Sequence, residues 1–171
     1  VSRAHAFGVK VIAYDPYLTV KKAVKLDVEL VSKDDLLTRS DYILMQAPMT
    51  PETHHFLSDA EFSAMKPGAI LVNTGRGPTI DNKALYQALT KGHLAAAGLD
   101  DPEEEPAKRS NWSPKDNPIF TLPNVLVTPH AAYYSEESIH AARVTAATQV
   151  AKVLTGQEPD YTVNAKALAK T

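Results

Sequence analysis

The sequence predicts an α/β fold in which a doubly wound parallel sheet carries helices on both of its faces. The first observation is a regular alternation of short apolar runs, which suit buried strands, with segments of helical periodicity. The second is the glycine that follows several expected helices, at Gly8, Gly92 and Gly156. The third is size, because 171 residues with 44% hydrophobic side chains can bury one sizeable core.

The expected strands share short apolar runs that stop at a polar residue, a glycine or a proline. They are residues 9–14, 28–31, 41–47, 69–73, 94–99 and 124–127. The expected helices share a polar cap: they start at Ser32, Ser58, Asp81 and Ser135, and residues 1–7 form the rear of another. The last helix extends to residue 155, and we expect a buried stripe of Ile139, Ala142, Ala146, Val150, Val153 and Leu154. Residues 101–118 are a polar, acidic and proline-rich loop.

Composition excludes several classes of function. The formal net charge of −2 argues against non-specific nucleic-acid binding and against a membrane-surface role. The absence of cysteine excludes disulfides, cysteine-ligated zinc and thiol catalysis. No apolar run reaches membrane-spanning length, so we expect a cytoplasmic protein without a membrane partner.

The stretch at residues 70–77 (ILVNTGRG) is the first candidate site. Residues 69–72 predict a strand buried on both faces, and Gly75 and Gly77 then flank a single cation, Arg76. Glycine at these positions allows either a positive φ or a close approach of the backbone to a ligand. A guanidinium at the carboxyl end of a buried parallel strand lies where open α/β sheets bind ligands, and it suits a carboxylate or a phosphate. The alternative is a surface turn with a solvated arginine.

The start of the chain predicts the second half of a βαβ unit, because a helix end is followed by a strand that ends at Asp15. In a dinucleotide-binding fold, an acid about twenty residues after the glycine fingerprint bonds the ribose hydroxyls. No G-x-G-x-x-G occurs in the 171 residues. Either the chain begins just after that fingerprint, or the similarity is accidental and Asp15, which precedes Pro16, is a plain turn former.

Five segments in order resemble the NAD-dependent D-isomer-specific 2-hydroxyacid dehydrogenases. They are residues 11–16 (VIAYDP), 47–53 (APMTPET), 72–77 (VNTGRG), 99–106 (LDDPEEEP) and 128–135 (TPHAAYYS). The fourth is similar to the family's L-D-V-F-x-x-E-P, from which Asp101 and Pro102 depart. The resemblance implies a Rossmann-like fold with its first strand and glycine loop missing. It also implies a partial NAD-binding domain at residues 1–156 and a tail at residues 157–171 that would return to an absent substrate domain.

The resemblance implies a catalytic set for reducing a 2-keto acid with NAD as the cofactor. His130 would donate the proton, Glu105 would orient His130, and Arg76 would hold the substrate carboxylate. The implied cofactor-binding set also includes Arg76 and His130, and its other members are Tyr14, Asp15, Pro16, Ala47, Pro48, Thr53, Thr74, Gly75, Asp100 and Ala132. Asp15 would favour NAD over NADP. No metal ligands are implied.

Each role has a simpler alternative. His130 could be an ordinary loop histidine, the class to which we assign His5, His54, His55, His93 and His140. Residues 103–105 could be a solvated acidic run, and Glu104 is an alternative to Glu105.

Three different functions fit the chain as a whole. Residues 130–136 and the acidic loop are similar to the C-terminal-binding proteins, NAD(H)-responsive corepressors, although Tyr133 replaces the usual Trp. A metabolic enzyme, such as a phosphoglycerate dehydrogenase or a glyoxylate/hydroxypyruvate reductase, is the favoured interpretation, and a non-catalytic remnant is the third. We expect the chain by itself to bind NAD poorly and to be inactive, and its full-length form to be a homodimer that acts on a small 2-hydroxy acid of unspecified identity.

Overall fold

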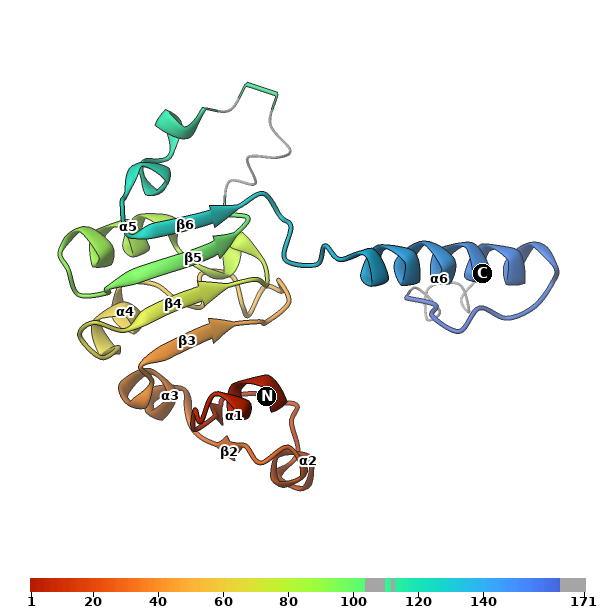
Figure 1. Cartoon of the computed structure of the whole chain (residues 1–171), viewed down its shortest axis with the longest axis horizontal. Helices are drawn as coiled ribbons and strands as arrows, with labels where there is room; N and C mark the ends of the chain where they lie inside the picture. Colours follow the sequence, from red (N-terminus) through yellow and green to blue (C-terminus); the bar gives the residue numbers. More distant parts are fainter. Residues whose placement is uncertain (104–109, 112, 164–171) are drawn as a thin grey trace. The chain divides into compact units, whose positions relative to one another are not determined.

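The computed structural model describes residues 1–103, 110–111 and 113–163. It contains two compact units, Val1–His130 and Ala131–Thr171 (Figure 1). The division falls just after His130, within the expected motif at residues 128–135. The expected domain boundary at residue 156 stays a prediction.

The first unit is built on a parallel sheet of four strands in the order β3-β4-β5-β6 (Figure 1). The strands are β3 (Tyr42–Met45), β4 (Ile70–Asn73), β5 (Ala96–Asp100) and β6 (Val125–Thr128). Their register places Asn73 beside Met45 and Leu99, and Asp100 beside Thr128. The carboxyl ends of all four strands therefore lie at one edge of the sheet. The predicted parallel α/β fold is confirmed.

Three helices connect or flank these strands, and each begins at the cap that the sequence predicts. They are α3 (Lys33–Arg39), α4 (Asp59–Ala64) and α5 (Asn82–Thr90). The Ser32 hydroxyl accepts a hydrogen bond from the Asp35 backbone N–H, and the Asp81 carboxylate accepts two from the start of α5. Ser58 and Glu61 form a capping box at the start of α4. These bonds satisfy backbone N–H groups that have no partner within a helix.

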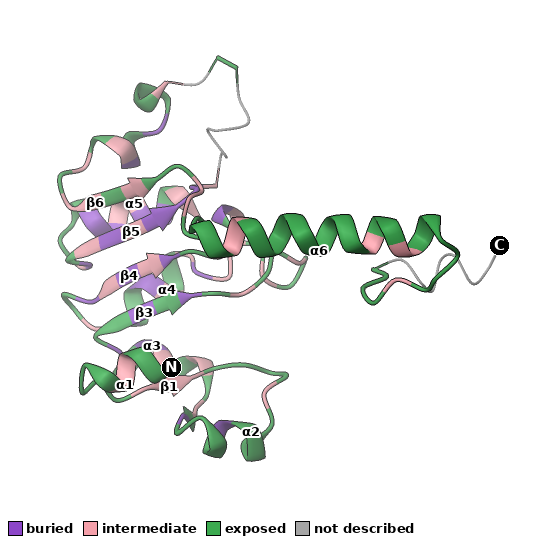
Figure 2. Ribbon diagram, turned by 45° about the vertical axis from the view of Figure 1, so that its right-hand side comes forward, coloured by how far each residue is buried: buried purple, intermediate pink, exposed green. Residues whose placement is uncertain are grey.

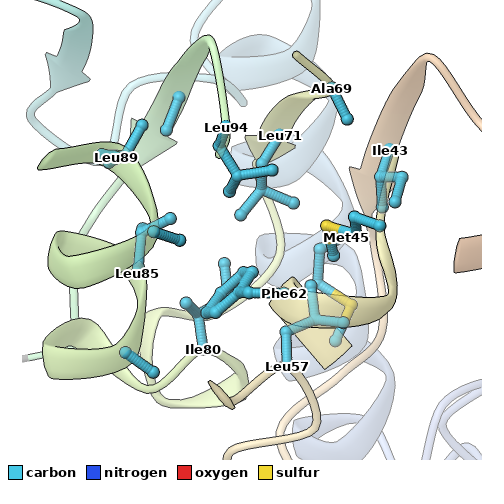
Figure 3. Packing of buried hydrophobic residues seen from close by; sticks show 14 of the residues in the cluster. Ile43, Met45, Leu57, Phe62, Ala69, Leu71, Ile80, Leu85, Leu89 and Leu94 are labelled. Carbon is cyan, nitrogen blue, oxygen red and sulfur yellow. The ribbon is translucent and has the colours of Figure 1, made fainter. Parts of the chain in front are cut away.

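The core lies between this group of helices and one face of the sheet (Figure 3). Leu71 of β4 and Leu85 of α5 are fully buried there, with Phe62 of α4 beside them. The other face differs, because Tyr42, Leu44 and Leu126 are more than half exposed. Figure 2 shows much of β3 in the colour of exposed residues. The expectation that β4 is buried on both faces is wrong, because its residues alternate between buried and half-buried. Helices over this second face stay a prediction.

The start of the chain forms a smaller layer, with α1 (Ser2–Ala6), β1 (Ile12–Ala13), α2 (Val20–Lys25) and β2 (Glu29–Leu30). β1 and β2 pair in parallel with each other and form a sheet separate from the four-stranded one. The expected strands here are therefore correct in place but only two residues long. The sequence analysis missed α2, which Thr19 caps by accepting a bond from the Lys22 backbone N–H.

Three short 3-10 turns complete the described part of the first unit. They are η1 (Gly77–Thr79), η3 (Pro114–Asp116) and η4 (Pro118–Thr121). The last two lie in and just beyond the region predicted as an irregular loop, and each starts with a proline at its first position, where the missing N–H costs nothing.

The second unit consists of α6 (Glu136–Leu154) and the segment after it. Asp160 folds back to accept hydrogen bonds from Lys152 and Gln149 at 2.6 and 3.0 Å. The predicted buried stripe is wrong: no residue of α6 is buried, and Val150, Val153 and Leu154 are more than half exposed. The apolar periodicity is present, but none of the described residues of this unit, 131–163, buries it. Among the described residues, no helix is long and apolar enough to cross a membrane.

Candidate functional site at the carboxyl edge of the sheet

Several predicted site residues of the first unit lie at the shared carboxyl edge of the four-stranded sheet. Pro48 lies after β3, Arg76 after β4 and His130 after β6, and Asp100 is the last residue of β5. Parallel strands bring such residues together because their carboxyl ends point the same way. The following contacts connect them.

A pocket of about 450 Å³ opens between the ends of β3 and β4. It is lined by Gln46, Ala47, Pro48, Met49, Thr74, Gly75 and Arg76. The Gln46 side-chain amide donates a hydrogen bond to the Thr74 hydroxyl, which joins the two strand ends. Five of the predicted cofactor-binding residues thus share one pocket. Its volume is within the usual range for small-molecule sites and suits one part of a dinucleotide.

Two buried polar side chains, those of Asn73 and Thr79, form hydrogen bonds with the backbone around Arg76. Asn73 accepts a bond from the Gly75 backbone N–H at 2.9 Å and donates one to the Arg76 carbonyl at 3.1 Å. The Thr79 hydroxyl donates to the same carbonyl at 2.6 Å. The guanidinium itself is exposed and donates to the Gly75 carbonyl at 3.0 Å. A fixed backbone therefore presents a cation to the pocket.

Gly75 and Gly77 serve close approach and not positive φ, since neither adopts a left-handed conformation. A Cβ on Gly75 would lie 3.0 Å from the Ala47 carbonyl oxygen. A Cβ on Gly77 would lie 2.4 Å from the Pro102 carbonyl carbon, which no real side chain tolerates. The neighbour at each glycine is backbone from another strand end, and the residue after Asp101 packs directly on the Arg76 turn.

The ends of β5 and β6 are joined by two carboxylates in succession. The Thr128 hydroxyl donates to Asp100 at 2.6 Å. Asp101 Oδ2 lies 3.0 Å from His130 Nδ1, and the Asp101 side chain is only 5% exposed. Sequence reasoning missed Asp101 and treated it as a departure from a motif. The signal was an acid at a position where that motif has an apolar residue.

The other predicted residues have different surroundings. Glu105 lies outside the described residues, so its predicted contact with His130 stays a prediction. Ala132 belongs to the second unit, where it is exposed. Thr53 closes its own turn, because its hydroxyl donates to the Pro48 carbonyl at 2.7 Å and accepts from the Thr50 N–H at 2.7 Å.

The three residues at the end of β1 are exposed. Asp15 Oδ1 accepts hydrogen bonds from the Tyr17 and Leu18 backbone N–H groups at 2.8 and 3.2 Å, as a turn-forming aspartate does. Tyr14 stacks on Phe56 with ring centroids 6.1 Å apart, and Pro16 follows Asp15 into the turn. The ribose role of Asp15 stays a prediction beside this local one.

A cluster of His54, His55 and Glu103 lies near the start of α5, with potential metal-ligating atoms within 4.8 Å of one another. The two imidazole rings are stacked at 4.0 Å and inclined by only 24°, so their in-plane lone pairs do not converge on one point. His55 instead hydrogen-bonds Glu103, whose other oxygen accepts from the Asn82 N–H at 3.3 Å. The cluster ties the segment after β5 to α5, and the absence of a metal site stays a prediction.

Comparison with known proteins agrees with this arrangement. Residues 1–132 match the family described as D-isomer specific 2-hydroxyacid dehydrogenase, NAD binding domain. D-3-phosphoglycerate dehydrogenase of Methanocaldococcus jannaschii is 45% identical over 165 residues, which are 96% of this chain but 30% of that protein. The chain thus spans about a third of the length of this relative.

Two solved structures share the fold. D-2-hydroxyisocaproate dehydrogenase superimposes with a TM-score of 0.83 at 35% identity, over 93% of this chain and 50% of that one. D-lactate dehydrogenase from Aquifex aeolicus, solved with NAD and lactic acid, gives 0.81 at 34% identity, over 91% and 49%. With three quarters of the chain matched by the family model, the chain belongs to the D-isomer specific 2-hydroxyacid dehydrogenases, and residues 1–132 match their NAD-binding domain.

Proposed function

We propose that this chain is the cofactor-binding part of an enzyme that interconverts a D-2-hydroxy acid and its 2-keto acid with NAD. The observation that carries the proposal is the carboxyl edge of the sheet, where an arginine on a fixed turn follows β4 and a histidine paired with a buried carboxylate follows β6. A 2-keto acid offers a carboxylate for the first and a carbonyl oxygen for the second.

The pocket between β3 and β4 supports NAD as the cofactor. Its lining combines apolar contacts from Ala47 and Pro48 with the Thr74 hydroxyl and the Gly75 backbone, a mixture that suits a ring and a sugar. Asp15 would hold the ribose hydroxyls through its second carboxylate oxygen while Oδ1 keeps its turn. NAD, when bound, supplies the hydride in the reducing direction and accepts it in the oxidising direction.

Arg76 would hold the substrate carboxylate, because the planar guanidinium can donate two parallel hydrogen bonds to the two carboxylate oxygens. The guanidinium is exposed, so its N–H donors are accessible to a substrate. The hydrogen bonds from Asn73 and Thr79 to the Arg76 carbonyl fix the backbone from which this side chain extends. Because the charge is fixed before the substrate arrives, little reorganisation is needed as negative charge develops on the carbonyl oxygen.

His130 would donate a proton to that oxygen during reduction and accept it back during oxidation. Imidazole is suited to this because it exchanges protons near neutral pH. Its side chain is about one third exposed, which leaves part of the ring accessible to a substrate.

The named relatives are dehydrogenases, which favours the enzyme over the corepressor as the function of this chain. Phosphoglycerate is the first substrate to test, because the Methanocaldococcus jannaschii relative carries that name. The homodimer and the cytoplasmic location also stay predictions.

The first experiment is an NMR titration of the isotope-labelled chain with NAD. We expect weak binding, with backbone amide shifts concentrated at residues 46–49 and 74–76, which line the pocket. Thr74→Ala should reduce these shifts, and Thr121→Ala, a distant exposed threonine, should leave them unchanged. Shifts spread over the whole surface, or none at millimolar NAD, would contradict the assignment of the pocket.

The second experiment tests the reaction in a chimera in which this chain replaces the matching segment of the Methanocaldococcus jannaschii enzyme. His130→Gln should lower kcat by about 10²- to 10⁴-fold, as loss of a general acid–base does. Arg76→Gln should raise KM and lower kcat, and Lys66→Gln, on the surface away from the pocket, should change neither. Equal rates for His130→Gln and the parent chimera would refute the proposed role.

A further inference from the structure

The backbone at the end of β5 is fixed on both sides of Asp101. On one side, Asp100 accepts a 2.6 Å hydrogen bond from Thr128 of the neighbouring strand. On the other, the Pro102 backbone packs so closely on Gly77 that no Cβ fits between them. Asp101 therefore has little freedom to move away from the site.

Asp101 also has an unusual backbone. Its φ is +93°, and that of His130 is +53°, so two non-glycine residues in the left-handed half of the map face one another across the strand ends. Such conformations cost energy and persist where the surroundings enforce them, often at functional sites. The side chains that these conformations direct are the two that meet at 3.0 Å.

We infer that Asp101 is the positioning residue of His130. Its carboxylate is an acceptor, so it selects the imidazole form with a proton on Nδ1 and fixes the ring by a charge-assisted bond. Nε2 is then the nitrogen that faces the substrate. This inference rests on the proposed function of His130 and deepens it.

The proton balance follows from that assignment. During reduction, the Nε2–H bond of the imidazolium breaks as a new O–H bond forms on the former carbonyl oxygen. The ring becomes neutral and keeps its remaining proton on Nδ1, where Asp101 holds it. Without the carboxylate, the neutral ring would be free to take the other tautomer, in which Nε2 carries the proton and cannot accept one back during oxidation.

The inference assigns to Asp101 the orienting role that the resemblance implies for Glu105. Both are carboxylates near His130 in the sequence-based scheme, but Asp101 is a departure of this chain from the motif, and its contact is observed. Mutating each acid separately distinguishes them.

The test is a long-range proton–nitrogen NMR spectrum of the imidazole rings, recorded on the chain at a pH where they are neutral. In the unaltered chain, we expect His130 mainly as the Nδ1–H tautomer. Asp101→Gly removes the carboxylate and suits the positive φ, so this variant should stay folded. Its tautomer ratio should shift at least about tenfold toward Nε2–H, as expected from the loss of a hydrogen bond to a charged group.

Three further variants complete the design. Asp101→Glu keeps a carboxylate and should restore part of the Nδ1–H population, whereas Asp59→Ala, which removes an exposed carboxylate on α4, should leave the ratio unchanged. Glu105→Gln should also leave it unchanged. An unaltered His130 ratio in Asp101→Gly, or a shift in Glu105→Gln alone, overturns the inference.

The measurement does not require activity, so it separates this inference from the proposed function. A tautomer shift in the chain together with an inactive parent chimera would refute the function and keep the pairing. An active chimera without a tautomer shift in the chain would do the reverse.

Discussion

The close contact between Gly77 and Pro102 offers the sharpest test of how the site is assembled. In Gly77→Ala, the new Cβ would lie 2.4 Å from the Pro102 carbonyl carbon, 2.5 Å from its oxygen and 2.6 Å from the Glu103 nitrogen. All three atoms are backbone, so no side-chain rotation relieves the clash.

The size of the response follows from these distances. Ordinary contact begins near 3.4 Å, so one of the two backbones must shift by about 1.0 Å. Overpacking of this kind typically costs 1–3 kcal/mol, and a loss of about 2 kcal/mol lowers the unfolding midpoint by roughly 6 °C in a chain of this size. The same shift moves the neighbour of Asp101, so its 3.0 Å contact with His130 should lengthen.

The assay is thermal unfolding of the chain, with Gly98→Ala as the matched control. A Cβ on Gly98 would meet the Val72 methyl groups at 3.8 Å, an ordinary contact, and φ there is not positive. This control should be within about 1 kcal/mol of the unaltered chain and can be stabilising, because alanine restricts the unfolded chain.

A second readout is the His130 tautomer, which should shift in Gly77→Ala in the same direction as in Asp101→Gly. If Gly77→Ala and Gly98→Ala unfold at the same temperature and both keep the tautomer, the strand ends are not packed as described, and the reasoning fails.

Two further substitutions test the supports of the site and of α4. Thr79→Val removes the hydroxyl that donates to the Arg76 carbonyl, and it should destabilise the chain by about 1–2 kcal/mol in urea unfolding; Thr79→Ser should recover part of this, and no loss in the valine variant would contradict the bond. Burial acts to raise the pKa of the Glu61 carboxyl, but hydrogen bonds from Lys33 and from the Ser58 N–H together lower it. Because the pKa is lower in the folded state than in the unfolded state, this stabilisation is present above the unfolded-state pKa and is lost as the pH falls through the folded-state pKa. Glu61→Gln should therefore lose about 1 kcal/mol at pH 7 and progressively less as the pH falls below the unfolded-state pKa, and a constant difference across urea titrations from neutral to acidic pH would contradict it.

The elements that were predictable from the sequence depend on local rules. Ser32, Ser58 and Asp81 each precede a helix that they cap, and such capping depends on residues within one turn. α2 was not predicted because it is only six residues long, so its apolar pattern is limited to Val20, Ala23 and Val24, of which only Ala23 is buried.

The parts that were not predictable depend on contacts between distant segments. The requirement for glycine at Gly77 comes from Pro102, which belongs to the next strand's loop, and no pattern around residue 77 contains that information. Likewise, the sequence around Asp101 indicates only an acid in a polar loop. Its contact with His130 depends on the register of β5 beside β6. The apolar stripe of α6 was recognisable, but its burial depends on a partner layer that residues 131–163 do not supply.

The exposure of α6 affects how readily this helix unfolds locally. Its nineteen residues are stabilised by their own backbone hydrogen bonds and by the Ser135 cap, with no buried side chain to hold them. Most of the stability of helices in proteins comes from the packing of an apolar face, which α6 lacks. Amide protons in α6 should therefore exchange with solvent far faster than those of β4 and β5, and a protease should cut the second unit while the sheet stays intact.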